Sequence, residues 1–182
     1  MANDFIKIND TVRSSTSTPG WGNAAVAFDR QCNPHFASWR SADELRKSIA
    51  EWSASYPDVL AAGPMLILDN RPLFDWTQID KRTIKRTDQS NIFAPRTAIG
   101  NRPDGTIVLL VVDGRSYRAY GASFVELATM GRWLGLCNML NLDGGGSSAV
   151  VGPPGLLNVP SDGFGFFPVE REVANAVVVV PK

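Results

Sequence analysis

The sequence predicts an α+β fold, with one domain in which helices pack on a mixed, largely antiparallel sheet. Three observations carry this prediction. Two segments begin with serine capping boxes typical of helix starts, several short apolar runs are typical of strands, and an Asp-Gly dipeptide separates two of these runs. A length of 182 residues, with 44% hydrophobic and 20% charged residues, suits a single globular domain with its own core.

The balance of charge argues against several classes of partner. Eighteen basic residues match eighteen acidic ones, so no net field favours nucleic acid or an anionic membrane. The basic cluster Lys81, Arg82, Lys85 and Arg86 has acidic neighbours and no interleaved aromatic rings, as expected of a solvated face. No apolar stretch approaches the roughly 20 residues of a membrane span, and the first residues lack a secretory-signal pattern. We therefore expect no nucleic-acid or membrane partner.

In the first part of the chain, a start signal predicts one helix. Residues 9–23 are rich in Ser, Thr and Gly and predict an irregular lead-in. The box Ser41-Ala42-Asp43-Glu44 then opens a helix that ends before Pro57. The apolar run 60–68 predicts a buried strand broken by Gly-Pro, and the polar residues 70–94 predict a long connection.

The second part of the chain predicts a hairpin followed by a helix. Residues 96–100 and 106–112 form the hairpin strands, with Asp104-Gly105 at the turn. A second capping box opens a helix over 123–134, which Gly135 ends in a left-handed conformation.

The end of the chain is predicted to contain an irregular loop and one buried strand. The valine-rich run 173–180 is apolar on both faces, so we expect it in the centre of the sheet. Residues 152–168 carry several Gly and Pro and predict an irregular loop. No internal repeat is visible in the sequence.

The most informative segment is the octapeptide 141–148, Asn-Leu-Asp-Gly-Gly-Gly-Ser-Ser, which lies between two apolar runs. It is too short and too well flanked for a flexible linker. Glycine lets a ligand approach the backbone closely, and consecutive N–H groups can form an anion-binding concavity to which serine hydroxyls add donors. A tight turn between two buried strands is the alternative that the octapeptide leaves open.

Other site types lack their required residues. The octapeptide has no Lys before its serines, as a nucleotide-binding loop requires, and no Gly-x-Ser-x-Gly elbow. The cysteines Cys32 and Cys137 have neither metal-ligand nor redox spacing, and the sequence does not decide whether they form a disulfide. Without His or Cys clusters we expect no zinc site. Asp113 and Asp143 could hold Ca²⁺ or Mg²⁺, but nothing in their spacing requires it, so we expect no cofactor.

Six segments in a fixed order resemble the phosphodiester glycosidase family. They are Ala62-Gly63-Pro64-Met65-Leu66, Arg96-Thr97-Ala98-Ile99-Gly100, Val112-Asp113-Gly114-Arg115, the helix Gly121 to Leu134, the octapeptide, and Arg171-Glu172-Val173-Ala174-Asn175-Ala176. The similarity covers roughly residues 60–182, which we take as the family-like core, and residues 1–59 as an N-terminal lead-in and helix of the same globular domain. Family members usually carry an earlier Asn-Gly-Phe-Phe-like strand that has no convincing counterpart here. A partner segment or a larger assembly could supply it.

The resemblance implies a hydrolase that cleaves the glycosidic bond of a sugar-1-phosphodiester, such as N-acetylglucosamine-1-phosphodiester, in a glycoconjugate or cell-envelope polymer. It also suggests extracytoplasmic or cell-surface action. Ordinary glycosidases use two carboxyl groups. A phosphate monoester leaves readily as an anion, so this reaction chiefly needs one carboxylate at the anomeric carbon and hydrogen-bond donors for the phosphate. The alternative is a catalytically incomplete carbohydrate-binding or structural module of a larger assembly.

Asp143 is our first candidate for the catalytic carboxylate. Asp113 is the second, as a partner acid/base or an orienting group, although Asp-Gly after a strand is also a common turn. Arg96 and Arg171 could make forked hydrogen bonds to phosphate, and Arg171 could equally form a structural ion pair. Asn141 could bind a sugar hydroxyl or orient the carboxylate. The remaining predicted substrate-binding residues are those of the loop itself: Gly144, Gly145, Gly146, Ser147 and Ser148.

Overall fold

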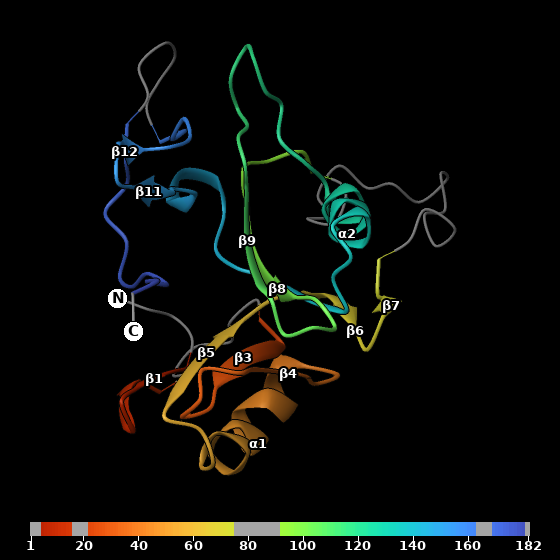
Figure 1. Cartoon of the computed structure of the whole chain (residues 1–182), viewed down its shortest axis with the longest axis vertical. Helices are drawn as coiled ribbons and strands as arrows, with labels where there is room; N and C mark the ends of the chain where they lie inside the picture. The colour runs from red at the N-terminus through yellow and green to blue at the C-terminus, as the bar shows by residue number, and fades with distance from the viewer. Residues whose placement is uncertain (1–4, 16–21, 75–91, 163–168, 181–182) are drawn as a thin grey trace.

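The chain folds into four layers, two antiparallel sheets stacked face to face with one helix on each outer side (Figure 1). The computed structural model describes residues 5–15, 22–74, 92–162 and 169–180. Helix α1 spans Ala42–Ser53, helix α2 spans Phe124–Trp133, and a short 3-10 helix, η2, spans Gly145–Ser147. The predicted α+β class, with antiparallel strands and packed helices, is confirmed.

Twelve strands make up the sheets of the described residues. The first sheet has the order β2-β1-β5-β3-β4, and the second has the order β7-β6-β10-β8-β9. A separate ribbon pairs β11 with β12. The strand bounds are β1 Ile6–Ile8, β2 Thr11–Ser14, β3 Ala24–Phe28, β4 Pro34–Ser38, β5 Asp58–Ala62, β6 Met65–Leu68, β7 Arg71–Pro72, β8 Arg96–Asn101, β9 Ile107–Val112, β10 Asn138–Asn141, β11 Val151–Gly152 and β12 Gly155–Leu156.

The two sheets have the same topology. In each, the order of strands is second, first, fifth, third, fourth, every neighbouring pair is antiparallel, and the helix connects the fourth strand to the fifth. The chain therefore contains a structural repeat, residues 6–62 and 65–141. The sequence showed no repeat because a shared topology constrains only where strands and turns lie, not which residues fill them.

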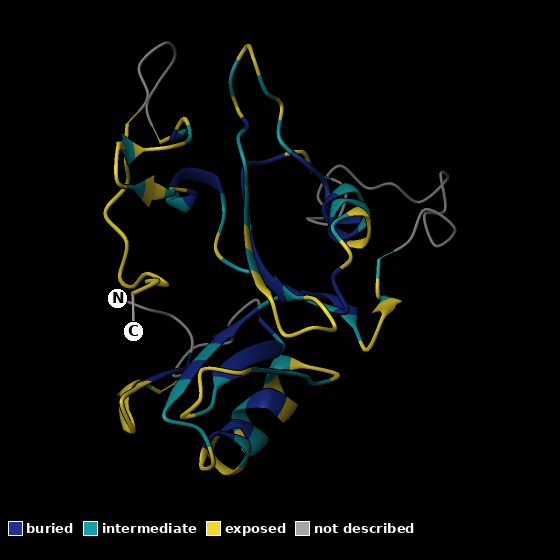
Figure 2. Cartoon of the chain, in the orientation of Figure 1, coloured by how far each residue is buried: buried dark blue, intermediate teal, exposed yellow. Residues whose placement is uncertain are grey.

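The central strands are buried on both faces, because each sheet lies between a helix and the other sheet (Figure 2). Alternate residues of β3 illustrate this: Ala25 and Ala27 pack toward α1, whereas Ala24 and Val26 pack toward the second sheet. The layer between the sheets is built from small and branched residues of both repeats. Its buried members are Ala24, Val26, Ala62, Met65, Ile99 and Leu140.

Both predicted helices exist, and their caps differ in detail. At α2 the Ser123 hydroxyl accepts from the Glu126 amide, and the Glu126 carboxylate accepts from the Ser123 amide, so the capping box is complete. At α1 the Ser41 hydroxyl caps Glu44 as predicted, but the Glu44 carboxylate accepts from the Arg40 amide one residue earlier. Gly135 ends the second helix with a φ of 76°, as predicted.

Several strand predictions need correction. Residues 11–14, predicted as irregular, form β2, and β1, β3 and β4 were not predicted at all. The terminal run 173–180 has no strand structure and is largely exposed, so its predicted place in the centre of a sheet is wrong. The central strands of the two sheets are β5 and β10, and each is paired on both sides with strands of its own repeat. The basic cluster at 81–86 lies outside the described residues.

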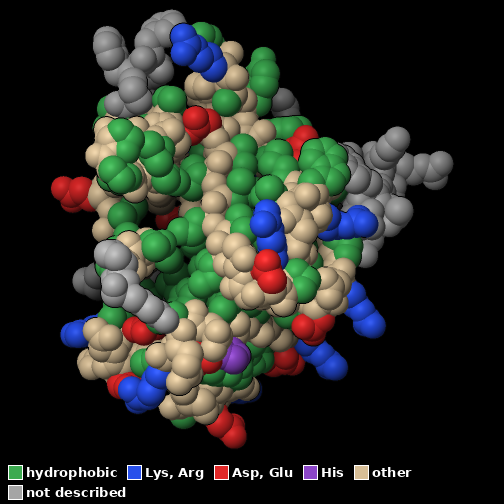
Figure 3. All heavy atoms as spheres, in the orientation of Figure 1, with side chains coloured by type: hydrophobic (Ala, Val, Ile, Leu, Met, Phe, Trp, Pro, Cys, Tyr) green, Lys and Arg blue, Asp and Glu red, His purple; other side chains and the backbone are tan. Residues whose placement is uncertain are grey.

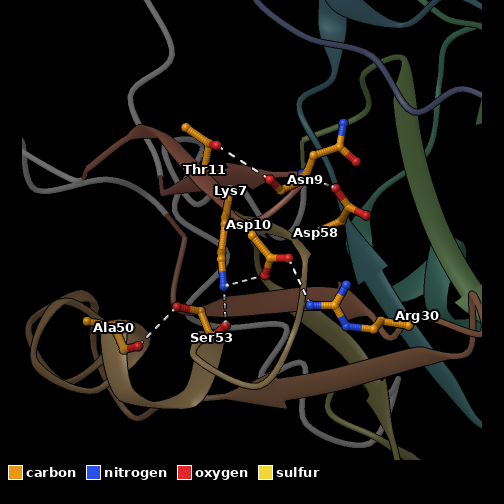
Figure 4. Close-up of polar contacts among 8 residues, drawn as sticks. All are labelled: Lys7, Asn9, Asp10, Thr11, Arg30, Ala50, Ser53 and Asp58. Carbon is orange, nitrogen blue, oxygen red and sulfur yellow. Dashed lines mark hydrogen bonds and ion pairs between the residues drawn. The ribbon is translucent and has the colours of Figure 1, made fainter.

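One buried cation joins the start of the chain to the end of α1 (Figure 4). Lys7, on β1, is 8% exposed, and its ammonium group donates to the Ser53 carbonyl at 3.0 Å. The Asp10 carboxylate lies 3.6 Å from the same nitrogen and also accepts from Arg30. The Ser53 carbonyl also accepts from the Tyr56 amide at 3.1 Å, so Lys7 adds a second, charged hydrogen bond at the end of the helix, where the last carbonyls have no intrahelical partners.

We expect Lys7→Met to lower the free energy of unfolding by about 1–3 kcal/mol, because the buried Ser53 carbonyl loses its charged donor and keeps only the Tyr56 amide. Lys47→Met, on the exposed face of α1, is the matched control and should change stability by less than about 0.5 kcal/mol. Urea denaturation of the two variants measures the difference. Equal stability of both would show that the Lys7 contact contributes nothing.

The β3–β4 hairpin turn is organised by one carboxylate. Asp29 accepts hydrogen bonds from the amide and side chain of Asn33 and from the Gln31 amide, and it lies 3.2 Å from His35 Nε2. The side-chain hydrogen bond from Asn33 is the main cause that lowers the pKa of Asp29 to about 2.

A lowered pKa means that the hairpin is stabilised by ionised Asp29 above the ordinary value of 3.8 and loses this contribution as the pH falls through about 2. We therefore expect an NMR titration of the Asp29 carboxyl carbon to have its midpoint near 2. In Asn33→Ala the midpoint should move up toward the ordinary value. A midpoint near 3.8 in the unmodified chain would contradict this arrangement.

Candidate active site

The glycine loop begins where β10 leaves the second sheet. The Leu142 amide donates to the Thr97 carbonyl at 2.8 Å, which continues the ladder with β8 one residue past the strand. Gly145 then adopts a φ of 63°, and the chain turns through the 3-10 helix η2. The predicted order of helix, buried strand and glycine loop is confirmed. Asp143 lies at the exposed start of this turn, where its Oδ1 accepts from the Gly144 amide at 2.9 Å.

The loop amides are less available than the sequence predicted. The Gly144 amide is used by Asp143, and the Gly145 amide donates to the Pro95 carbonyl at 2.9 Å. The Ser147 and Ser148 amides donate within the turn, to the carbonyls of Gly144 and Gly145. Most of the predicted anion-binding concavity is therefore satisfied by the protein's own carbonyls, and an anion would need side-chain donors.

Two predicted substrate-binding residues are buried supports of the loop. Asn141 is 5% exposed, and its amide nitrogen donates to the carbonyls of Gly63 at 2.9 Å and Leu142 at 2.8 Å. Ser148 is 1% exposed, and its hydroxyl accepts from the Thr97 hydroxyl at 3.1 Å. Thr97, interpreted from the sequence as a plain strand residue, thus also holds the end of the loop. Both side chains are buried and contact the fold itself, and their roles in substrate binding stay predictions.

Arg96 is also structural in this fold. It is 5% exposed, and its guanidinium donates to the carbonyls of Ala122 at 2.8 Å and Ile92 at 2.6 Å. It lies 4.1 Å from the centroid of the Phe124 ring, at the start of α2. Burial lowers the pKa of the Arg96 guanidinium, and the nearby positive charge of Arg115 lowers it further. In this arrangement the guanidinium is held by backbone carbonyls, and its role as a phosphate donor stays a prediction.

Arg115 is the residue at the loop that sequence reasoning did not assign. A Cβ built on Gly145 would lie 3.0 Å from Arg115 Nη1, so the guanidinium rests directly on the glycine backbone. Arg115 is exposed and has a φ of 55°. Among the described residues, no carboxylate lies within the 4.0 Å ion-pair distance of its guanidinium. The Val-Asp-Gly-Arg segment carried the signal that could have identified it.

A second cation lies against the next glycine. The Arg171 guanidinium forms a two-nitrogen ion pair with the Asp162 carboxylate, with Nε donating at 2.9 Å. A Cβ on Gly146 would lie 2.3 Å from Asp162 Oδ1 and 2.9 Å from Arg171 Cζ. The hydrogen bond raises the pKa of Arg171, and the charge of Asp143 adds to this effect. Arg171 is thus at the loop as predicted, in the ion pair that the sequence left as an alternative.

Asp113 anchors a later segment of chain. Its Oδ1 accepts from the Asn158 side chain at 3.1 Å and from the Val159 amide at 3.0 Å. The Asn158 side chain also accepts from the Val150 amide and donates to the Ser148 carbonyl, just after the glycine loop. The structure therefore gives Asp113 a positioning role beside the loop, and no contact in the described residues joins it to Asp143.

The surface assembled here is the loop from Asp143 to Ser147, flanked by the Arg115 guanidinium and the Asp162–Arg171 pair. A family model described as phosphodiester glycosidase matches residues 4–180. This chain belongs to the phosphodiester glycosidase family. The match covers almost the whole chain, including the first sheet.

Individual relatives are similar over shorter stretches. The SPbeta prophage-derived uncharacterized protein YomE of Bacillus subtilis (strain 168) is 35% identical over 121 residues, which are 65% of this chain and 17% of that protein. The N-acetylglucosamine-1-phosphodiester alpha-N-acetylglucosaminidase of Mus musculus is 36% identical over 72 residues, 40% of this chain and 14% of the mouse enzyme. The chain thus spans less than a fifth of the length of these relatives.

A solved structure supports the fold. The zebrafish N-acetylglucosamine-1-phosphodiester alpha-N-acetylglucosaminidase catalytic domain, auto-inhibited by its pro-peptide, superposes with a TM-score of 0.70 at 19% identity. The superposition covers 93% of this chain and 55% of the zebrafish chain. Within the described ranges, no group of three or more His, Cys, Asp or Glu residues could hold a metal ion, and no helix is both long and apolar enough to cross a bilayer.

The two neighbouring glycines should respond differently to a methyl group. In Gly146→Ala the nearest atoms to the new methyl group are the ends of the Asp162 and Arg171 side chains, so the variant should displace their exposed ion pair with little change in stability. Gly144→Ala meets the Pro95 carbonyl at 2.8 Å, a backbone atom that must shift, and should cost about 1–3 kcal/mol.

The pKa of Asp162 reports the displacement directly. The hydrogen bond from Arg171 lowers the pKa of this carboxyl, so in Gly146→Ala its NMR titration midpoint should rise toward the ordinary value. An unchanged midpoint, or equal stability losses for the two alanine variants, would show that the pair does not lie on Gly146.

Proposed function

We propose that this chain hydrolyses the glycosidic bond of a sugar-1-phosphodiester, such as N-acetylglucosamine-1-phosphodiester, in a glycoconjugate or cell-envelope polymer. Family membership supports this class of reaction. One observation in the structure carries the proposal. The Arg115 guanidinium, which has no carboxylate within the 4.0 Å ion-pair distance among the described residues, rests on Gly145, two residues along the loop from exposed Asp143.

The proposed reaction is a hydrolysis that breaks one bond and consumes one water molecule. Water adds to the anomeric carbon, the bond from that carbon to the phosphoryl oxygen breaks, and the products are a free sugar and a phosphate monoester. The positive charge that develops on the sugar ring favours a nearby carboxylate, and the negative charge that develops on the leaving phosphate favours a guanidinium. The site needs both groups close together, and Arg115 rests on Gly145, two residues along the loop from Asp143.

The proposed roles follow from exposure and pairing. Asp143 faces the anomeric carbon, oriented by the Gly144 amide. Arg115 binds the phosphate by a forked pair of hydrogen bonds. Arg171 is fixed by Asp162, and the pair closes the side of the site at Gly146. Asp113 keeps the chain at Asn158 and Val159 in place.

The chain covers only part of its relatives, so other segments are part of the proposal. A partner segment or a larger assembly would supply the remainder of the sugar pocket, and action outside the cytoplasm or at the cell surface fits a glycoconjugate substrate. A carbohydrate-binding or structural module without turnover is the competing function, and the activity assay distinguishes the two.

Asp143→Asn should fold normally and lower kcat on a sugar-1-phosphodiester by about 10²–10⁴, because the amide keeps the size of the side chain but not its charge. Phosphate-linked sugar release from a panel of such diesters is the measurement. Full activity in the variant would remove Asp143 from the reaction. Saccharide binding without release by the unmodified chain would favour the module.

Arg115→Gln should lower kcat/KM by about 10²–10³, because an oriented cation at the leaving phosphate is lost. Arg118→Gln is the matched control, since Arg118 lies in the same connection but stacks on Tyr117, 5.2 Å from the ring centroid. The control should keep kcat/KM within about twofold of the unmodified chain, as expected of an exposed residue away from special contacts. Similar losses in both variants would indicate general electrostatic attraction, not a specific contact of Arg115.

A further inference from the structure

The C-terminal segment 173–180 is an exposed apolar chain without a partner strand among the described residues. Its valines include Val178, 72% exposed, and Val179, 82% exposed. No charged residue occurs between Val173 and Val180. Runs of β-branched residues favour extended structure in a sheet, and leaving several of them in water forgoes a substantial burial free energy.

Strand β9 presents a complementary open edge. Among the strands that the structure describes, it ends the second sheet and pairs with β8 alone. In an antiparallel ladder, every second residue of a strand points its backbone N–H and C=O groups at the neighbouring strand. The Arg102 amide donates to the Thr106 carbonyl at 2.9 Å, so Thr106 and every second residue after it point toward β8. The backbone groups of Ile107, Leu109 and Val111 therefore point away from β8, toward the open edge. Ile107 and Leu109 are also 39% and 44% exposed, an unusual composition for an unprotected edge.

The two elements meet at the glycine loop. The end of β9 leads directly to Asp113, which bonds the Val159 amide, and to Arg115, which rests on Gly145. The start of the C-terminal segment leads from Arg171, which rests on Gly146. One end of each element is therefore fixed within a side-chain length of the same loop.

We propose that residues 173–180 close onto the open edge of β9 as an antiparallel sixth strand of the second sheet. A chain that leaves the loop at Arg171 and runs back along β9 is antiparallel to it. The six residues of β9 span about 20 Å, and eight residues of extended chain are long enough to cover them. Figure 3 shows hydrophobic side chains gathered around a hollow near the middle of the molecule, the kind of surface that such a strand would cover. This inference does not depend on which reaction the site performs.

Amide hydrogen exchange on the full chain at low protein concentration tests the closure. Ile107, Leu109 and Val111 should exchange at least about tenfold more slowly than open edge amides, because each would donate to, or be shielded by, the added strand. Val178→Pro, which removes a backbone donor, should abolish this protection. Val178→Thr, which keeps a β-branched side chain, is the matched control and should retain it. The Leu127 and Ala128 amides of α2 report that each variant remains folded.

Each outcome decides the proposal. Protection in a chain that sediments as a monomer, lost in the proline variant alone, supports closure by the chain's own segment. Fast exchange at the three β9 amides of the unmodified chain overturns it. Protection that grows with protein concentration, together with a dimer in sedimentation, also overturns it, because the strand would then come from a second copy.

Discussion

The site depends on the two hydrogen bonds of the buried Asn141 amide. Its nitrogen joins the Gly63 carbonyl, just beyond the last strand of the first repeat, to the Leu142 carbonyl, just beyond the last strand of the second. A buried amide without acceptors would cost a few kcal/mol, so this contact fixes the register between the ends of the two sheets. The glycine loop leaves the fold at that point, and its position therefore follows from how the two repeats pack.

Because the position of the loop is fixed, two arginine side chains can lie directly against its backbone. Gly145 and Gly146 carry no side chain, so two guanidinium groups can rest on the loop backbone where a Cβ would collide with them. The two cations differ in their pairing: Arg171 forms an ion pair with Asp162, whereas Arg115 has no carboxylate within ion-pair distance among the described residues and acts on Asp162 only from farther away. The carboxylate of Asp143 beside them completes a surface with one anionic and one cationic group free to act on a ligand.

Much of the second repeat could be predicted from the sequence, because its signals are local. The Asp104-Gly105 turn, the capping box at Ser123 and the left-handed Gly135 each depend on a few adjacent residues. The first repeat was missed where its strands are rich in alanine, as in β3, and carry no alternation. At the site, sequence chemistry located the loop and Asp143 but could not show that Arg96, Asn141 and Ser148 are buried, since burial is decided by contacts with distant segments.

The measurement that most directly tests the glycine loop as the substrate site is NMR of the ¹⁵N-labelled chain titrated with a sugar 1-phosphate. The account predicts saturable shifts of the Gly146 amide and of the Arg115 Nε–H signal. The buried Arg96 Nε–H should stay unchanged, because Ala122 already accepts from it. Saturable shifts elsewhere on the molecule, or none at the loop at millimolar ligand, would contradict the account.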